Sequence, residues 1–524
     1  MNASVTNSPA TAKALEQALA LHRQGNLPGA MERYVKVLQD DPRNADALYY
    51  VAVVAMQDGQ FEEGIKLAQR ALAFGPPQAR VHNVLGRAYH QLGRNREALE
   101  SFNRAIAVDP KFADGHGNRA NLLSELGRFN EAMVGFDNAL LLRPDSAEDW
   151  SNRGATLQDL DRLEEALASC DRALGLRPEL VASQFNRAGI LRDLGRLDEA
   201  LTAYGGALEV APQAAEGHLG RAMVHLLRGD WDAGFRDYEF RTGVGAPTFV
   251  PLEHPRWKGE PLPDAQLVLV AEGGLSDTIH SCRFAPLLAA RGFDVTILTD
   301  EAMRPLLSKL PGVTVVSSAG DIPSDKPIRW LPLLSVPGVL GVRPDTVPAE
   351  APYLTVDPVR AAAWAKHLGG AGFKIGINWI SGHSFKNDIP LTAFAPLAAL
   401  PDVRLISLQK GPAAQDIMQV PFRDKIEALN ADPDAGANLF LDTAAAMMNL
   451  DLVVTCDTSV AHLAGALARP VFTALPTAPD WRWLLEREDT PWYPTMRLFR
   501  QSRRGEWSDV LALIAQATRT RAYN

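Results

Sequence analysis

A proline recurs every 34 residues through the first half of the chain, and this spacing limits the possible folds more than any other feature. The prolines are Pro42, Pro76, Pro110, Pro144, Pro178 and Pro212. A second series with the same step is Gly25, Gly59, Gly93, Gly127, Asp161, Gly195 and Gly229. Self-similarity at a fixed period of this length indicates a stack of small repeated units.

Two further series keep the same register. Small residues recur at Ala30, Gly64, Ala98, Ala132, Ala166 and Ala200, and aromatic residues at Tyr34, Phe102, Phe136, Tyr204 and Tyr238. Glycine permits a turn between two helices, and proline ends the second helix. The small residues let paired helices approach closely, and the aromatic fills the gap between hairpins. This pattern resembles the tetratricopeptide repeat. We therefore predict an all-α superhelix over residues 11–241, with six full repeats and a partial one.

Polar side chains also recur with this step on the first helix of successive repeats. One set is Asn118, Asn152 and Asn186, and the other is Glu125, Asp159 and Asp193. We expect both sets to line the concave surface of the superhelix. Asparagine amides can donate to and accept from an extended peptide backbone, and the asparagine set resembles the ladder of O-GlcNAc transferase. The alternative is that these side chains only solvate an exposed helix face.

Charge and cysteine content narrow the class of protein. The net charge of −9 argues against a nucleic-acid binder, which usually has a basic face. The three cysteines, Cys170, Cys282 and Cys456, are odd in number and lack metal-binding spacing, which favours a reducing compartment. The first residues lack the apolar stretch of a secretory signal, and no apolar run is long enough for a transmembrane helix. We expect a cytoplasmic protein without membrane insertion.

The second half has a different pattern. A proline-rich junction covers residues 242–264, and a buried strand is predicted at 266–270, followed by a glycine-containing turn, a helix and a second strand at 294–300. Further strands are predicted after residues 374 and 403, and a strand-turn-helix-strand unit at 450–476. Such β-α-β units imply parallel sheets. We predict two Rossmann-like lobes, at 265–350 and 371–510, joined by a connection at 351–370.

Ligands of open α/β sheets bind at the carboxyl ends of the strands, and three predicted strand ends carry polar residues. The first contains Gly274, Ser276 and Asp277. Asp277 is either a helix cap or a general base that takes a proton from an acceptor hydroxyl.

The second strand end carries Ser381 and Lys386. The ammonium of Lys386 could neutralise a departing diphosphate, or it is simply solvated. The third carries Asp457, Thr458, Ser459 and His462 at a helix start. Its hydroxyls and backbone amides suit an anion, and the alternative is a capped helix with a core histidine.

Residues 268–507 resemble the ADP-heptose:lipopolysaccharide heptosyltransferase family. The resemblance is carried by residues 274–277, by the loop with Lys386 and by residues 457–470, although Ser276 stands where the family usually has glycine. It implies two lobes of the GT-B type and an inverting transfer that needs no metal and no cofactor. By resemblance, Asp277 is the base and Ser381 and Lys386 bind the donor phosphate.

The same resemblance assigns donor binding to Asp457, Thr458, Ser459 and His462. Gln409 and Lys410 lie on another strand-end loop that could meet the nucleotide. Trp481 and Trp483 could stack on a base or sugar, and core packing is the alternative.

The fusion of the two halves suggests the function. Repeats that hold a peptide next to a sugar-transferring domain suit a protein acceptor, and tethering raises its effective concentration. We expect a glycosyltransferase that modifies serine or threonine of a protein from a nucleotide-sugar. Bacterial flagellin glycosyltransferases have a similar layout, so flagellin is the leading acceptor. The alternatives are an interaction scaffold with a degenerate α/β domain, and transfer to a polysaccharide.

Overall fold

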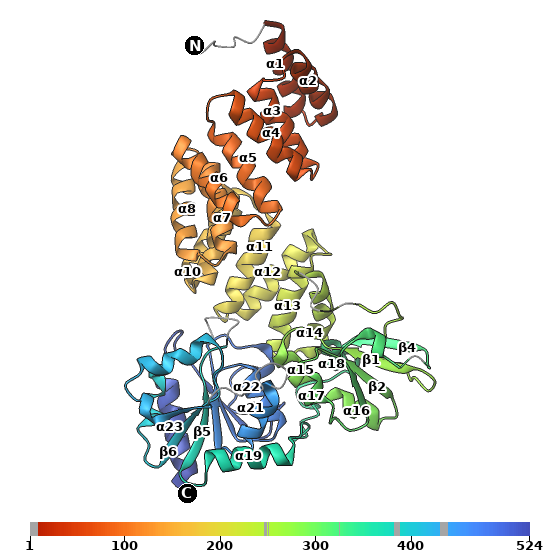
Figure 1. The fold of residues 1–524 in the computed structure, drawn as a ribbon, viewed down its shortest axis with the longest axis vertical. Helices are drawn as coiled ribbons and strands as arrows, with labels where there is room; N and C mark the ends of the chain where they lie inside the picture. The colour runs from red at the N-terminus through yellow and green to blue at the C-terminus, as the bar shows by residue number, and fades with distance from the viewer. Residues whose placement is uncertain are drawn as a thin grey trace. The chain divides into compact units, whose positions relative to one another are not determined.

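The computed structural model of the 524-residue chain describes residues 9–245, 249, 251–323, 325–381, 388–429 and 439–523. The chain forms two compact units, the first ending at Ile190 and the second beginning at Leu191 (Figure 1). Among the described residues, no helix is both long enough and apolar enough to cross a membrane.

The first unit consists of antiparallel helical hairpins, each made of an odd-numbered helix and the next even-numbered one. Its helices are α1 (Pro9–Arg23), α2 (Leu27–Asp40), α3 (Ala45–Gln57), α4 (Phe61–Phe74), α5 (Ala79–Gln91), α6 (Asn95–Val108), α7 (Ala113–Glu125), α8 (Phe129–Leu142), α9 (Ala147–Asp159) and α10 (Leu163–Leu176). The prediction of an all-helical first half is confirmed. The unit boundary falls within α11 (Val181–Asp193).

The turn inside each hairpin has a left-handed backbone at the predicted glycine. Gly127 has a φ of 73°, and Asp161, which interrupts the glycine series, adopts the same conformation with a φ of 61°. Aspartate tolerates this region better than most residues because its short side chain can bond locally. The turn geometry is therefore kept even where the glycine is lost.

Replacing Gly127 with alanine should lower the free energy of unfolding of the first unit by about 1 kcal/mol. An added Cβ would meet no atom within 4 Å, so the cost is conformational rather than steric. The matched control is Gly175→Ala inside α10, where φ is not positive and the added Cβ is also unopposed. That change should be neutral or slightly stabilising. Urea unfolding followed by circular dichroism measures both, and an equal loss in the two variants would contradict the explanation.

A further contact repeats with the proline series and was not predicted from the sequence. In the four repeats from Pro110 to Pro212, a side chain six residues after the proline donates to that proline's carbonyl oxygen. His116 Nε2 lies 3.0 Å from Pro110 O, and Trp150 Nε1 lies 3.0 Å from Pro144 O. The equivalent residue in the next repeat, Gln184, makes the same bond at 2.8 Å. The chain thus closes these inter-repeat turns with histidine, tryptophan or glutamine, and this variation hides the register from pattern reading.

The second unit begins with the remaining hairpins. Its helices there are α12 (Leu197–Val210), α13 (Ala215–Leu227), α14 (Trp231–Tyr238) and the short 3-10 helix η1 (Glu239–Gly243). With eight residues, α14 is shorter than its equivalents, in agreement with a partial last repeat near residue 241. We refer to α13 and α14 as the last hairpin.

A four-stranded parallel sheet follows, which we call the first sheet. Its strands are β1 (Gln266–Val270), β2 (Asp294–Leu298), β3 (Val313–Val316) and β4 (Ile328–Pro332), in the order β3-β2-β1-β4. Its helices are α15 (Leu275–Ser281), α16 (Phe284–Ala290), α17 (Arg304–Leu307) and α18 (Val336–Val339), with 3-10 helices η2 (Ala319–Asp321) and η3 (Leu333–Ser335). All five residues of β1 are buried, because this strand is central.

The second sheet has six parallel strands. They are β5 (Phe373–Asn378), β6 (Val403–Ser407), β7 (Ile426–Ala428), β8 (Leu452–Thr455), β9 (Val471–Leu475) and β10 (Met496–Arg500), in the order β10-β9-β8-β5-β6-β7. Read from β7, this is the third, second, first, fourth, fifth and sixth strand. The order reverses between β5 and β8, and ligands of open α/β sheets bind at such a reversal.

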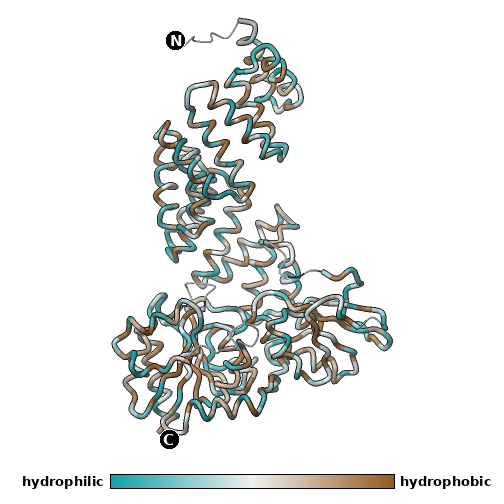
Figure 2. The backbone as a smooth tube through the Cα atoms, in the orientation of Figure 1, coloured by the Kyte–Doolittle hydropathy of each residue, from teal (hydrophilic) through white to brown (hydrophobic). Residues whose placement is uncertain are grey.

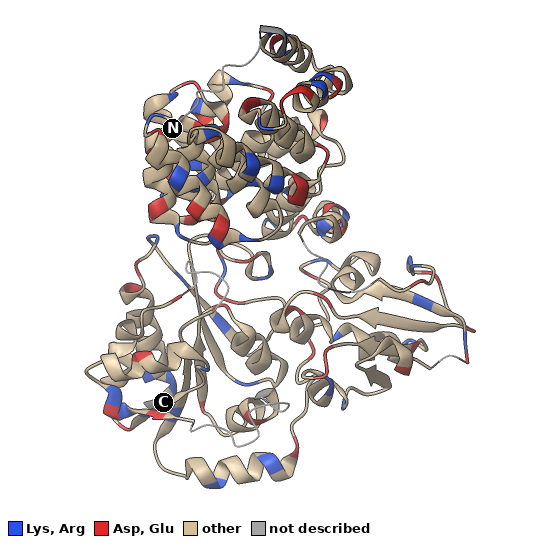
Figure 3. Cartoon of the chain, turned by 45° about the horizontal axis from the view of Figure 1, so that its top comes forward, with Lys and Arg blue, Asp and Glu red and all other residues tan. Residues whose placement is uncertain are grey.

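Helices surround the second sheet. They are α19 (Pro358–Leu368), α20 (Ala395–Ala398), α21 (Leu439–Met447), α22 (Ser459–Ala466) and α23 (Ser508–Tyr523). The 3-10 helices are η5 (Leu391–Phe394), η6 (Pro412–Gln419), η7 (Arg423–Lys425) and η8 (Trp481–Trp483). Hydrophobic residues concentrate along the strands of both sheets (Figure 2), while charged residues lie mostly on helices and loops (Figure 3).

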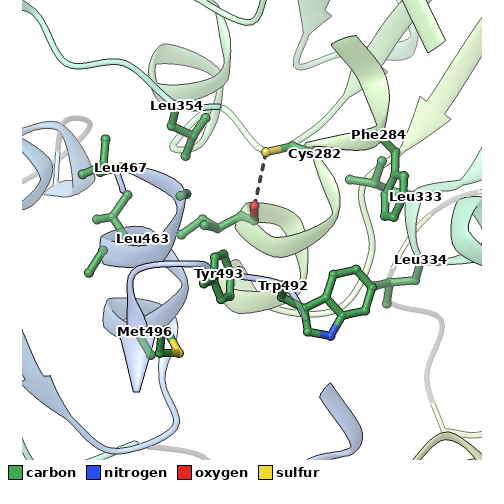
Figure 4. Packing of buried hydrophobic residues seen from close by; sticks show 14 of the residues in the cluster. Cys282, Phe284, Leu333, Leu334, Leu354, Leu463, Leu467, Trp492, Tyr493 and Met496 are labelled. Atoms are coloured by element: carbon green, nitrogen blue, oxygen red, sulfur yellow. Dashed lines mark hydrogen bonds between the residues drawn. The ribbon is translucent and has the colours of Figure 1, made fainter. Parts of the chain in front are cut away.

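One hydrophobic core runs through the second unit. It includes Trp231 of the last hairpin, Leu269 of β1, Leu463 of α22 and Trp492 near β10. Figure 4 shows part of it, where α15 and α22 pack together. There the Cys282 thiol donates to the carbonyl of Ile279 at 3.3 Å. The last hairpin therefore shares its core with both sheets.

The three cysteines are free and buried, as expected from their number and spacing. Burial raises the pKa of the Cys170 and Cys282 thiols to about 12. Both thiols are therefore protonated and unreactive in the folded protein.

Candidate functional site

The repeats of the first unit enclose a hollow of about 620 Å³. Its polar wall includes Asn118, Asn121, Ser124, Glu125, Asn152 and Thr156, and its apolar wall includes Met56, Phe61, Phe102 and Phe136. The structure therefore brings Asn118, Asn152 and Glu125, from two successive repeats, to one surface. A wall with both amides and aromatic rings can accept a polypeptide backbone together with an apolar side chain.

The asparagines also bond along the stack. Asn118 Nδ2 donates to Asn83 Oδ1 at 2.9 Å, and Asn152 Nδ2 donates to Asn121 Oδ1 at 2.9 Å. Asn186 Nδ2 lies 3.3 Å from the hydroxyl of Ser151. Each bond fixes the orientation of a carboxamide. A carboxamide has two donors and an acceptor, so after one such bond it can still form hydrogen bonds with a bound peptide.

The acidic set divides among different environments. Glu125 accepts from His90 Nε2 at 2.7 Å at the wall of the hollow, and Asp159 is exposed. Asp193 belongs to the second unit, is 9% exposed and forms an ion pair with Arg192 at 2.8 Å. Of these regularly spaced residues, Glu125 therefore lies in the wall of the hollow, whereas Asp193 is held in an ion pair with its neighbour Arg192.

In the second unit, Asp277 lies in the first turn of α15, directly after β1. It is the third helical residue, and its Oδ2 accepts from the backbone N–H of Gly274 at 3.0 Å. Its Oδ1 accepts from Arg482 Nη2 at 2.6 Å. The cap predicted for Asp277 is therefore present in a different form, since the aspartate bonds back to the helix start instead of occupying the cap position.

The glycine that this turn requires is Gly273, which has a φ of 71°. A Cβ there would lie 2.3 Å from Asp277 Oδ2, so only glycine fits beside the carboxylate. Gly274, selected from the sequence, has an extended backbone and is the helix cap. Ser276 is half-buried in the same helical turn.

Arg482 links Asp277 to the second sheet. It lies in η8, on the loop that follows β9, and its side chain is 8% exposed. Its Nη1 donates to Asp480 Oδ1 at 3.0 Å, and its guanidinium lies 4.7 Å from the centre of the Trp481 ring. Sequence reasoning missed both Arg482 and Asp480. The available signal was their position in a loop after a parallel strand, next to two tryptophans.

Asp457 lies at the end of β8, before the helix α22. Its Oδ1 is 4.0 Å from His462 Nε2, and it interacts electrostatically with Asp480, Arg482 and Asp277. Burial, assisted by the neighbouring Asp480 carboxylate, raises the pKa of Asp457 to about 7. This carboxyl therefore exchanges its proton near neutral pH. We call Asp277, Asp457, Asp480 and Arg482 the carboxylate cluster.

His462 is 2% exposed, and its Nδ1 lies 2.8 Å from the Tyr493 hydroxyl. Its ring is stacked on Trp483 with 5.1 Å between ring centres. Burial is the main cause that keeps the pKa of His462 well below its usual range, so the ring is neutral at pH 7. The histidine therefore packs in the core while its second nitrogen approaches Asp457.

Thr458 caps α22 and joins it to the neighbouring strand. Its hydroxyl donates to Asn378 Oδ1 at 2.9 Å and accepts from Val460 N–H at 3.2 Å. Ser459 is the first residue of the helix. Asn378 ends β5, so this contact lies where the strand order reverses. The sequence prediction did not include Asn378, which only the pairing of β5 with β8 brings to Thr458.

The remaining predicted donor residues have structural partners. Gln409 Oε1 accepts from Asn378 Nδ2 at 2.7 Å and from Ile380 N–H at 2.9 Å, and Lys410 beside it is exposed. Ser381 donates through its hydroxyl to Asp388 Oδ1 at 3.0 Å. Gln409 therefore braces the end of β5. Lys386 lies outside the described residues.

Trp481 and Trp483 are 3% and 0% exposed. Trp481 packs edge-on against Trp231 and Phe235 of α14, with ring centres 5.9 and 5.7 Å apart. Core packing, the alternative given for these residues, describes both of them. Neither has a free ring face for a base or sugar.

The cluster combines three carboxylates with one guanidinium. It can accept a proton and favour developing positive charge, and it suits a phosphate poorly. Within the described ranges, no group of three or more His, Cys, Asp or Glu residues could hold a metal ion.

Comparison with known proteins identifies the helical half. Family models described as tetratricopeptide or TPR repeats match residues 21–88, 86–127, 150–180 and 185–239. The helical hairpins are tetratricopeptide repeats. Repeats of this kind stack into surfaces that bind proteins or peptides.

Protein FlbA of Caulobacter vibrioides is 27% identical over 326 residues, which cover 57% of this chain and 54% of that protein. The chain thus spans about half the length of this curated relative.

Solved repeat proteins are also similar. A tetratricopeptide repeat protein from Parabacteroides merdae is 16% identical with a TM-score of 0.38, covering 46% of this chain and 94% of that one. PilF from Pseudomonas aeruginosa is 20% identical with a TM-score of 0.35, covering 38% of this chain and 90% of that one.

Proposed function

We propose that this protein is a glycosyltransferase that moves a sugar from a nucleotide-sugar donor to a serine or threonine of a protein held by the repeats. The observation that carries the proposal is the meeting of Asp277, which follows β1 of the first sheet, with Arg482 and Asp457, which follow strands of the second. Residues at the carboxyl ends of strands in two parallel sheets then act on one ligand. Two Rossmann-like lobes of the GT-B type are the corresponding fold.

In the proposed reaction, Asp277 accepts the proton of the acceptor hydroxyl. The hydroxyl oxygen attacks the anomeric carbon, and the bond from that carbon to the donor phosphate breaks. The nucleotide leaves with the electron pair, and the configuration at the anomeric carbon inverts. General-base assistance of this kind contributes about 10²–10⁴-fold to a rate.

The start of α22 is the proposed place for the departing phosphate. Thr458 and Ser459 begin the helix, whose first backbone N–H groups favour an anion. The proposal keeps Ser381 and Lys386 as further phosphate ligands and assigns no cofactor, since the nucleotide-sugar is itself a substrate. The negative charge of the departing phosphate is thus stabilised at the start of α22, while the proton of the acceptor hydroxyl is taken up elsewhere, at Asp277.

The repeats would supply the acceptor. The hollow with Asn118 and Asn152 suits an extended segment of protein, and linkage to the transferase domain raises the local concentration of that segment. Flagellin remains the leading acceptor.

The direct test offers the purified full chain UDP-, ADP-, GDP- and CMP-linked sugars and measures the release of nucleotide. A donor that is consumed is then incubated with flagellin, and the intact mass of flagellin is measured. Nucleotide release with a mass increase of one sugar supports the proposal. Nucleotide release without it, but with labelled polysaccharide, supports transfer to a polysaccharide instead.

One observation favours a scaffold with an inactive domain. Both oxygens of Asp277 already accept hydrogen bonds, from Gly274 and Arg482. The same test separates the candidates, because a scaffold would release no nucleotide from any donor while still binding a protein through its repeats.

For the repeats, the double variant Asn118→Ala, Asn152→Ala should weaken acceptor binding by about 1–3 kcal/mol, or roughly 5- to 150-fold in Kd. Each asparagine supplies the peptide with about one hydrogen bond. Isothermal titration with the acceptor protein measures the change. The matched control is Asn138→Ala, an exposed position on α8 that should leave Kd unchanged. Equal affinities for the double variant and the control would refute peptide binding by these amides.

A further inference from the structure

Arg482 is unusually buried for a charged residue in a loop between two strands. The loop follows β9, yet the Arg482 side chain is 8% exposed and reaches across to Asp277 on the first sheet's helix α15. We propose that Arg482 is a positioning residue: it holds the Asp277 carboxylate in place, and the last hairpin holds Arg482. This inference rests on the proposed function, in which Asp277 is the base.

The first step is the fixing of Asp277. Its two oxygens are held by different donors, Oδ2 by the N–H of Gly274 at 3.0 Å and Oδ1 by Arg482 Nη2 at 2.6 Å. The side chain is nevertheless 27% exposed, so it remains accessible to a ligand. Without Arg482, the carboxylate would keep one anchor and could rotate about it.

The second step is the fixing of Arg482 itself. Asp480 Oδ1 accepts from both the side chain and the backbone N–H of Arg482, each at 3.0 Å. The guanidinium also lies over the Trp481 ring. A planar guanidinium can bridge two carboxylates and stack at the same time, whereas an ammonium acts as a point charge. The geometry therefore requires arginine rather than any cation.

The third step links this arrangement to the repeats. Trp481, on which Arg482 stacks, packs against Trp231, Phe235 and Tyr238 of α14. Trp231 also stacks on Trp492, with ring centres 5.2 Å apart. All of these side chains are buried. The last hairpin thus holds Arg482 in place through Trp481. The repeat that ends the proposed acceptor-binding stack therefore also shapes the proposed active site.

Charge in the cluster gives the inference a measurable consequence. The groups facing Asp277 are Arg482, Asp480, Asp457 and Tyr238. Arg482 is the cation among them, so its removal leaves Asp277 beside two other acids. The Asp277 carboxylate then keeps the hydrogen bond from Gly274 and loses the one from Arg482, which changes its environment.

The test uses the full chain and three variants. R482Q removes the guanidinium that joins Asp277 to Asp480, and R482K keeps a positive charge without the planar guanidinium. D480N weakens the bond that holds Arg482 but keeps the arginine. R487Q is the matched control, because Arg487 pairs with Asp489 at 2.6 Å in the same loop and has no contact with the cluster.

With a donor from the UDP, ADP, GDP and CMP series that the wild type consumes, we expect R482Q to lower kcat about 10- to 100-fold, with KM for the donor changed about twofold or less. R482K should recover little, D480N should show a smaller loss, and R487Q should match the wild type. The double variant D277N/R482Q should be no slower than D277N, since Arg482 acts through Asp277. Independent, multiplying losses in the double variant would overturn the inference.

A second readout does not depend on activity. Infrared spectra recorded at one pH follow the carboxylate stretching bands, whose frequencies respond to hydrogen bonding, and the band missing in D277N belongs to Asp277. In R482Q this band should shift from its wild-type frequency, because the bond from Arg482 is lost, and in R487Q it should not move. An unshifted band in R482Q would overturn the positioning role. Absence of nucleotide release by the wild type would instead count against the proposed function, while a shifted band would still support the contact.

Discussion

Asparagine in place of Asp277 is expected to slow the proposed sugar transfer by about 10²–10⁴-fold, because an amide cannot accept the proton that the acceptor hydroxyl would lose. The change preserves the size of the side chain. Alanine at the same position should cause a loss of similar size, since in both variants the missing property is basicity. The measurement is kcat for nucleotide release in the presence of the acceptor, with melting temperature as a check on folding.

The control for this prediction is Asp489→Asn. Asp489 is exposed and pairs with Arg487 in the loop that carries Arg482, so it is an aspartate in the same part of the fold without contact to the cluster. Its replacement should leave kcat unchanged. Wild-type turnover in Asp277→Asn would remove the base from the mechanism. Loss of donor binding with unchanged kcat would show that Asp277 binds the donor instead.

The repeats could be predicted from the sequence because their contacts join residues within one repeat or in neighbouring repeats. Gly127 needs a left-handed backbone within its own hairpin, and Phe102 packs against Gly86 of the neighbouring helix, where a Cβ would lie 2.4 Å from the ring. Such short-range requirements leave a regular signal. Asp161 shows that the signal survives the loss of one member, since its backbone remains left-handed.

The sheets could be predicted only in part. Continuous apolar runs marked β1 and β8, but β3, β4, β7 and β10 were missed. The strand β7 has three residues, and β4 ends on Pro332, a residue that weakens a strand assignment. Edge and short strands depend on their neighbours for stability, and this dependence leaves little trace in their own sequence.

The candidate site divides in the same way. Asp277 and Asp457 were predictable from the sequence because each lies just after a predicted strand. Arg482 was not, because it is 205 residues from its partner Asp277, and the packing of α15 on α22 and of the last hairpin on η8 brings the two together. Selection of Gly274 instead of Gly273 has a related cause, since the sequence shows that a turn is present but not which glycine faces the carboxylate.

The buried ion pair between Arg241 and Glu272 gives the second large expected effect, this time on stability. Arg241 ends the repeats in η1, and Glu272 follows β1 just before the Asp277 turn, with side chains 8% and 3% exposed. Glu272 also accepts from Leu334 N–H at 3.2 Å. Arg241→Met should lower the free energy of unfolding of the second unit by about 3–5 kcal/mol, because it leaves a buried carboxylate without its cation. Urea unfolding followed by tryptophan fluorescence measures this loss.

The loss should also depend on pH in a defined direction. Burial raises the pKa of Glu272 in the folded protein, and Arg241 opposes that rise. In Arg241→Met the opposition disappears, so the pKa rises further above its value in the unfolded chain. A carboxyl with a raised folded pKa takes up a proton on folding, and its favourable contribution is lost as pH increases through that pKa. The destabilisation should therefore be smaller at pH 5 than at pH 8.

Two variants make this prediction specific. Arg241→Met combined with Glu272→Gln should recover at least half of the lost stability and remove most of the pH dependence, since no buried charge remains. Lys326→Met breaks the exposed pair with Asp294 and should cost about 0.5 kcal/mol or less. A loss for Arg241→Met that equals this control, or that is the same at both pH values, would mean that water reaches Glu272 and that the last hairpin is only loosely joined to the first sheet.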